Sequence, residues 1–180
     1  MNARQKQIAN AAIDLFLKDG VGVSTASIAH AAGVSNGTLF YAYPTKQTLI
    51  DAIYISTKEQ LVAALTLDDS DQFNRATLQR LWSEYMAWGR QRPQDRQIMN
   101  LLWLAGLASS EAKTQGDEIL ARFNVLFEQA FADGVIRGPN VAYLNQLVVL
   151  QLDLVLTQNL RGDDEALAFD ILCNSIGLTQ

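Results

Sequence analysis

The strongest constraint on the fold is a helical spacing of apolar residues that recurs along almost the whole chain. In the first segment, Ile8, Ala12, Leu15 and Phe16 follow the i, i+4, i+7, i+8 spacing of one buried helix stripe. Prolines occur only at positions 44, 93 and 139, and no segment keeps the apolar/polar alternation of a strand. We therefore predict an all-α chain of about nine helices and no strands.

Glycines, prolines and capping residues mark where the predicted helices begin and end. Asp19-Gly20 closes the first helix, and Pro44-Thr45 precedes a long one over 46–67. At 1.5 Å per residue that helix is about 33 Å long, enough to connect two domains. The nine predicted ranges are 3–18, 26–32, 36–41, 46–67, 72–91, 93–109, 114–132, 140–160 and 164–176.

Composition excludes several classes of protein. One cysteine, Cys173, allows no internal disulfide, and one histidine, His30, leaves a metal site dependent on carboxylates that do not cluster. The longest apolar-rich run, 141–156, contains Asn145, Gln146 and Asp153 and is too short for a bilayer. We expect a cytoplasmic protein with no membrane association, no metal and no cofactor.

Charge is divided unevenly along the chain. The first fifty residues carry four basic and two acidic side chains, a net of +2, whereas the remaining 130 carry ten basic and seventeen acidic ones, a net of −7. This asymmetry is consistent with a small basic module on an acidic body. Apolar residues make up 49% of the chain, slightly more than in an average globular chain. We expect an oligomer interface or an apolar pocket to bury the excess.

Residues 25–42 have the pattern of a helix-turn-helix. Ile28, Val34 and Leu39 are spaced to share a small core, and Gly33 supplies the turn between the two helices. Ser35 caps the second helix and fixes where it starts. Two packed helices joined by a glycine turn would show the same pattern without binding anything, so the wider context decides.

That context resembles the N-terminal module of the TetR family of bacterial transcriptional regulators. About fifty residues match in order and spacing. The matching elements are Ala11-Ala12, Leu15-Phe16, Gly20, Ile28-Ala29, Ala32-Gly33-Val34-Ser35, Gly37-Thr38-Leu39-Phe40, Tyr43, Thr45-Lys46 and Leu49. The resemblance implies a helix-turn-helix DNA-binding domain over 1–45 and a helical ligand-binding and dimerisation domain over 46–180.

The second helix of the motif is expected to enter the major groove of double-stranded operator DNA. Asn36 suits adenine and Thr38 suits a thymine methyl, while Gly37 lets the backbone approach. Phosphate contacts are expected from hydroxyls, backbone N–H groups and one lysine. Phe40 occupies a position where the family most often has Tyr, and it lacks the hydroxyl that could bind a phosphate. We therefore expect the other residues of the set to make the phosphate contacts. The full predicted set is Ser24, Thr25, Ser35, Asn36, Gly37, Thr38, Phe40, Tyr41, Tyr43 and Lys46. For Tyr43, core packing is an equally good interpretation, and His30 is interpreted as a surface residue.

The last two predicted helices suit a homodimer interface. The eighth is apolar nearly all round and must be covered on every side, by its own domain and by a second copy. A helix buried centrally in a monomer is the alternative. The expected interface residues are Leu144, Val148, Val155, Leu167 and Ile171.

An aromatic and methionine set in the middle of the chain suits either ordinary core or a pocket for an apolar effector. The predicted pocket residues are Met86, Met99, Trp103, Phe123, Phe127 and Asp153. Asp153 would face a cationic ligand, or else lie at the helix surface or pair with an arginine.

The function expected from these features is a ligand-responsive transcriptional repressor, released from a pseudo-palindromic operator by a small, largely apolar effector. One alternative is a constitutive DNA-binding regulator without a ligand. Another is a helical enzyme, against which stands the absence of a nucleophile–base pair and of a phosphate loop in the sequence. We therefore expect no enzymatic activity and no catalytic residues.

Overall fold

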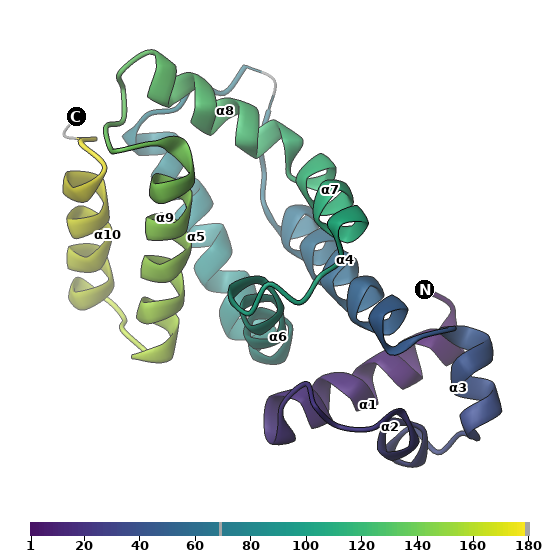
Figure 1. The fold of residues 1–180 in the computed structure, drawn as a ribbon. Helices are drawn as coiled ribbons and strands as arrows, with labels where there is room; N and C mark the ends of the chain where they lie inside the picture. The colour runs from purple at the N-terminus through teal and green to yellow at the C-terminus, as the bar shows by residue number, and fades with distance from the viewer. Residues whose placement is uncertain (69, 179–180) are drawn as a thin grey trace. The chain divides into compact units, whose positions relative to one another are not determined.

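The computed structural model describes residues 1–68 and 70–178, most of which lie in helices. Within these residues there are ten helices and no strand, which confirms the all-α prediction (Figure 1). Their bounds are α1 Ala3–Asp19, α2 Thr25–Ala31, α3 Asn36–Ala42, α4 Lys46–Ala64, α5 Arg75–Gln91, α6 Pro93–Leu104, α7 Ser110–Ile119, α8 Ala121–Ala132, α9 Val141–Thr157 and α10 Asp163–Ser175. No helix in this part of the chain is long and apolar enough to cross a membrane.

The tenth helix results from a break within one predicted helix, and the sequence pattern does not indicate this break. The single helix predicted over 114–132 is two helices, α7 and α8, separated at Leu120, where ψ moves to 4°. In addition, α6 ends at Leu104 and α7 already begins at Ser110. Residues 92–119 and residues 120 onward belong to different compact units, so the break lies where the chain passes from one unit to the other.

The helices form two compact units. The first consists of Met1–Gln60 and Arg92–Ile119, and the second of Leu61–Gln91 and the described part of Leu120–Gln180. The long helix α4 begins in the first unit and ends in the second.

The first unit is built around α1, which contacts α2, α3 and α6. Ile8 and Phe16 of α1, Ile28 of α2 and Leu39 of α3 are almost completely buried and form the centre of its core. Burial of one such side chain stabilises a fold by about 1.5–3 kcal/mol. The α1 stripe predicted from helical spacing is therefore the one that organises the N-terminal helices.

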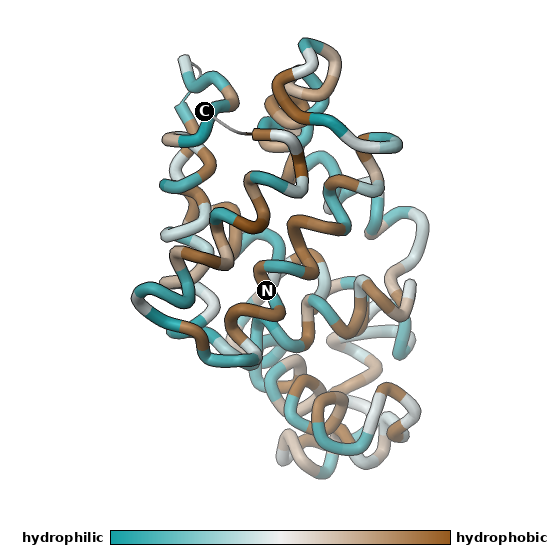
Figure 2. The backbone as a smooth tube through the Cα atoms, turned by 90° about the vertical axis from the view of Figure 1, so that its left-hand side faces the viewer, coloured by the Kyte–Doolittle hydropathy of each residue, from teal (hydrophilic) through white to brown (hydrophobic). Residues whose placement is uncertain are grey.

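In the second unit, α9 packs against α5, α8 and α10, and α9 and α10 form an antiparallel pair (Figure 1). Trp82 of α5 and Phe169 of α10 meet edge to face, with ring centroids 5.4 Å apart. Ion pairs from Arg75 to Asp170 and from Arg90 to Glu165 link the same two helices at the edge of this core. Figure 2 shows hydrophobic and hydrophilic residues interleaved along the tube, as expected for amphipathic helices.

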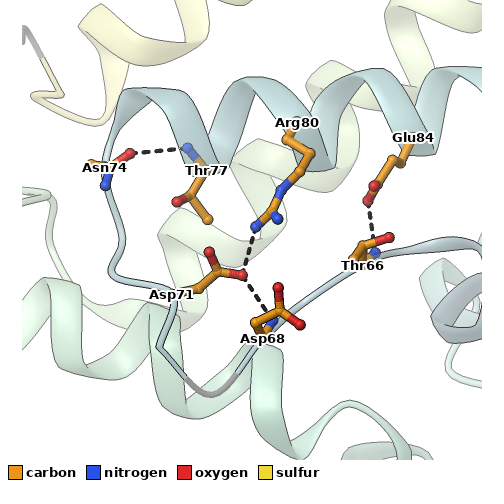
Figure 3. A network of polar contacts seen from close by, with 7 residues as sticks. All are labelled: Thr66, Asp68, Asp71, Asn74, Thr77, Arg80 and Glu84. Atoms are coloured by element: carbon orange, nitrogen blue, oxygen red, sulfur yellow. Dashed lines mark hydrogen bonds and ion pairs between the residues drawn. The ribbon is translucent and has the colours of Figure 1, made fainter.

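A short segment between α4 and α5 is fastened to α5 by polar contacts (Figure 3). One carboxylate oxygen of Asp71 accepts hydrogen bonds from the Asp68 amide, at 2.8 Å, and from the Arg80 guanidinium, at 2.6 Å. The amide of Thr66 donates to Glu84 at 2.7 Å. The segment is thereby held at both of its ends against one helix.

Candidate functional site

The α2–turn–α3 element is fixed by two serine caps and one glycine. Ser24 Oγ accepts the Ser27 amide at 3.0 Å, and Ser35 Oγ accepts the Thr38 amide at 3.1 Å. Between the helices, Gly33 has a φ of +64°, a conformation that residues with a Cβ adopt only with strain. These contacts define where α3 starts and how it turns away from α2.

The outward face of α3 carries a polar and aromatic set. Asn36 and Gly37 are exposed, Phe40 is half-exposed, and the side chain of Tyr41 is 93% exposed. Thr38 is half-buried, and its hydroxyl lies 2.9 Å from Ser35 Oγ. A single helix therefore presents an amide, an aromatic ring and a phenol to solvent.

Tyr43 does not belong to this exposed set. Its side chain is 3% exposed, and its hydroxyl donates to the backbone carbonyl of Gln5 at 3.1 Å. Burial raises the pKa of Tyr43 to about 12, because the phenolate would lose its hydration. Of the two interpretations of this residue, the structure supports core packing.

Lys46 starts α4 and ties it back to the loop between α1 and α2. Its ammonium donates to the Val23 carbonyl at 2.6 Å and lies 5.9 Å from the centre of the Phe16 ring. Ser24 and Thr25 follow Val23 directly, so this lysine lies beside the exposed start of α2. Two of the three N–H groups of an ammonium remain for another acceptor.

Two glutamines that the sequence patterns did not single out brace the module. Gln7 Nε2 donates to the Ala32 carbonyl at the end of α2, at 2.7 Å, and Gln5 Nε2 donates to the Ala42 carbonyl at the end of α3, at 3.4 Å. Both side chains satisfy terminal helix carbonyls that lack an intrahelical partner. They lie on the polar side of α1, where helical periodicity carries no signal.

These features define a class of protein. A short helix is held rigidly by a preceding helix, a glycine turn and a serine cap, and its polar face is open to solvent. This is the geometry of a helix-turn-helix, a motif whose second helix can enter the major groove of DNA.

Comparison with known proteins shows what the N-terminal module and the fold are similar to. Residues 8–53 match the family model of the bacterial regulatory proteins of the tetR family. The fold is similar to that of a TetR family transcription regulator from Marinobacter aquaeolei VT8, with a TM-score of 0.77 and 21% identity over 96% of this chain and 95% of that one. It is also similar to a protein from Shewanella sp. PV-4 assigned to the same family, with a TM-score of 0.82 and 20% identity over 97% and 98% of the two chains.

A further similar structure is the multidrug binding protein EbrR complexed with imidazole, with a TM-score of 0.63 and 22% identity over 98% of this chain and 96% of that one. Residues 8–53 therefore match the N-terminal module of the tetR family, and the described chain has the fold of these solved structures.

A small cavity lies within the second unit. It has a volume of about 150 Å³ and is bordered by α5, α8, α9, α10 and the segment that precedes α5. Phe123 and Phe127, both predicted pocket residues, are in its wall. Phe127 meets Phe73 edge to face, with centroids 5.5 Å apart.

The other predicted pocket residues lie elsewhere. Met86 is a fully buried core residue of α5, and Asp153 is half-buried on α9 outside the cavity wall. Met99 and Trp103 belong to the first unit, where Trp103 packs against the core. Aromatic and methionine content does not separate a cavity wall from an ordinary core, which explains the mixed set.

The predicted interface residues also divide into two groups. Leu144 and Val155 are fully buried within the protomer, so they lie on the inner side of α9. This corrects their predicted placement at an interface: α9 is apolar nearly all round, and the sequence did not indicate which stripe turns inward. Val148 is half-buried and borders the cavity, whereas Leu167 and Ile171 of α10 are at least half-exposed. The apolar side chains exposed on α9 are Tyr143, Leu150 and Leu154.

Proposed function

We propose that the chain is a ligand-responsive repressor that binds a pseudo-palindromic operator as a homodimer and is released by a small, largely apolar effector. The observation that carries this proposal is the exposed polar face of α3 on a rigid support. Ser35 caps the helix, Leu39 anchors it in the core, and Tyr41 projects into solvent. A helix held in this way can enter a major groove without reorganising.

The proposed division of labour on DNA follows from the exposed groups. Asn36 suits bidentate recognition of adenine, and the Thr38 methyl suits a thymine methyl. Tyr41 and Phe40, which are exposed, are proposed for sugar and backbone contacts. Ser24, Thr25 and Lys46 are proposed as phosphate contacts at the start of α2. Tyr43 supports this surface from beneath instead of touching DNA.

A dimer is proposed because one small helix-turn-helix buries too little surface for tight specific binding. Two copies reading half-sites about 34–36 Å apart, or a multiple of that, overcome this limit. Apolar side chains left exposed on α9 and α10 supply a surface for the second copy, namely Tyr143, Leu150, Leu154, Leu167 and Ile171. A cluster of large exposed apolar residues is typical of interaction surfaces.

Release is proposed to occur by a shift between two arrangements of the chain. An effector in the second unit would favour the arrangement in which the two α3 helices no longer match the half-sites. The long helix α4 connects that unit to the DNA-binding module and would transmit the change. A tenfold preference of the effector for one state is worth about 1.4 kcal/mol.

The proposal is tested by selecting tight-binding fragments from a random DNA library with the full-length protein. We expect two-fold symmetric sites, bound with two protomers per site. Leu154→Glu/Ile171→Glu should convert a dimer into a monomer in analytical ultracentrifugation, whereas Val125→Glu, at an exposed apolar position of α8, should leave it dimeric. Asymmetric sites bound by one protomer would contradict the dimeric-repressor proposal.

A further inference from the structure

The cavity of the second unit has walls of one chemical kind. Among the described residues that border it, thirteen are aliphatic or aromatic, two are asparagines, Asn124 and Asn145, and none is charged. Transfer of an ion into such surroundings is strongly unfavourable unless a counter-charge is present. The cavity is therefore suited to uncharged molecules.

The size of the cavity limits its occupant. Its volume is about 150 Å³. An apolar cavity of about 150 Å³ in another protein holds one benzene molecule. Ring faces and edges are available from Trp82 and from the Phe73–Phe127 pair, whose interplanar angle is 82°. Edge-to-face contacts of this kind favour a flat ring over a bulky aliphatic ligand.

Asn145 is the unusual residue in this wall. It lies inside α9, where asparagine is less favourable than most residues because its side chain competes for backbone hydrogen bonds. It is half-buried, and no group within residues 1–68 and 70–178 forms a hydrogen bond with its side chain. Its amide therefore has two donors and one acceptor available beside an apolar cavity.

Combined, these observations define a ligand. We propose that the cavity binds a neutral, single-ring molecule carrying one hydroxyl, amine or carbonyl group that hydrogen-bonds the Asn145 amide. The aromatic wall holds the ring, and Asn145 determines its orientation. This inference rests on the proposed ligand response and narrows it, because it excludes charged effectors and effectors with more than one ring.

The test uses four probes of one ring each: phenol, toluene, benzoate and benzylammonium. Binding to the full-length protein is measured by titration calorimetry and by the change in tryptophan fluorescence, since Trp82 borders the cavity. Phenol should bind saturably, toluene about fivefold more weakly for lack of one neutral hydrogen bond, and the two ions not measurably over the same concentration range. Failure of both neutral probes, or binding of either ion as tightly as phenol, would overturn the proposal.

Two variants and a matched control assign the binding to this cavity. Asn145→Leu should abolish the preference for phenol over toluene, while Gln146→Leu makes the same change at the adjacent exposed position and should keep it. Val149→Phe, in the cavity wall, should weaken both neutral probes at least tenfold. Circular dichroism establishes that each variant is folded. An unchanged phenol-to-toluene ratio in Asn145→Leu, or unchanged binding in Val149→Phe, would overturn the assignment.

A DNA-binding measurement separates this inference from the proposed function. If phenol binds through Asn145 but leaves operator affinity unchanged, the cavity inference holds and the proposed ligand response is wrong. If a single-ring compound lowers operator affinity equally in wild type, Asn145→Leu and Val149→Phe, the ligand response holds and the cavity inference is wrong.

Discussion

Lys46 and Val23 are joined by a hydrogen bond of 2.6 Å from the lysine ammonium to the valine carbonyl, which anchors the first turn of α4 to the loop before α2. Lys46→Met keeps the aliphatic stem over Phe16 and removes the donor. Because a charged donor to a partly buried carbonyl is lost, we expect about 1 kcal/mol of destabilisation in urea unfolding. Lys18→Met, at an exposed position, is the control and should change stability by less than half of that. Equal effects in the two variants would show that the contact contributes nothing specific.

Tyr43 and Tyr41 are two residues apart and are expected to respond in opposite ways. Tyr43→Phe removes a buried hydroxyl that donates to Gln5, so it should lower the free energy of unfolding by about 1 kcal/mol and leave operator affinity within twofold. Tyr41→Ala should leave stability nearly unchanged, because that side chain is exposed, and should weaken operator binding. The reverse pattern would move Tyr43 back into the DNA-contacting set.

Alkaline titration gives Tyr43 a second signature. Its pKa is raised to about 12, so the folded state favours the neutral phenol. The stabilisation is complete below pH 10, where the Tyr43 phenol is neutral in the unfolded chain as well. It is lost as the pH rises from 10 to 12. Tyr54 shares this shift, through burial and then the nearby charge of Asp117. In Tyr43→Phe/Tyr54→Phe, the fall in stability between pH 10 and 12 should be smaller than in wild type.

Gly116 of α7 lies directly against α4. A Cβ added there would lie 2.9 Å from Cδ of Lys58 and 2.9 Å from Cε1 of Tyr54, both of which are buried. Gly116→Ala should therefore destabilise the protein by about 1–3 kcal/mol through overpacking, measured by urea unfolding. At Gly22 the added methyl would meet nothing within 4 Å, so Gly22→Ala should be neutral or slightly stabilising. A neutral Gly116→Ala would show that α4 and α7 separate easily.

Asp71 links acid sensitivity to the segment before α5. Its pKa is lowered by the hydrogen bond from the Asp68 amide and then by that from Arg80 (Figure 3). The resulting stabilisation is present above pH 3.8, the ordinary value, and is lost as the pH falls through the lowered pKa. Asp71→Asn should flatten this part of the acid unfolding curve and speed amide hydrogen exchange in residues 65–74. Glu128→Gln, at an exposed position of α8, should change neither the acid unfolding curve nor the hydrogen exchange of this segment.

Sequence alone predicted the N-terminal module well because its determinants are local. The Ser35 cap, the Gly33 turn and the burial of Ile28 and Leu39 follow from spacing and backbone preference, and the structure has each of them. Long-range hydrogen bonds from side chains to the backbone, such as that from Gln7 to Ala32, could not be predicted from the sequence. A polar residue on a helix face is equally compatible with exposure to solvent.

Elsewhere, tertiary packing decided what periodicity could not. Residues 114–132 were predicted as one helix, yet the helix breaks at Leu120, where the chain changes unit. In α9, apolar residues on all sides left the inward stripe undetermined, and Leu144 and Val155 turn out to be core. From the sequence, Asn145 was only one of the polar residues that interrupt the apolar run 141–156, and its place in the cavity wall emerged from the structure.

The most direct test of DNA recognition by α3 is fluorescence anisotropy of wild type and Asn36→Ala/Tyr41→Ala with the operator recovered by selection. Both substituted side chains are exposed, so the variant should unfold at the same urea concentration as wild type. We predict operator binding that weakens as salt is raised, and a loss of at least tenfold in the variant, since one good base contact is worth about 1–3 kcal/mol. Operator affinity equal in wild type and the folded variant would contradict recognition through α3.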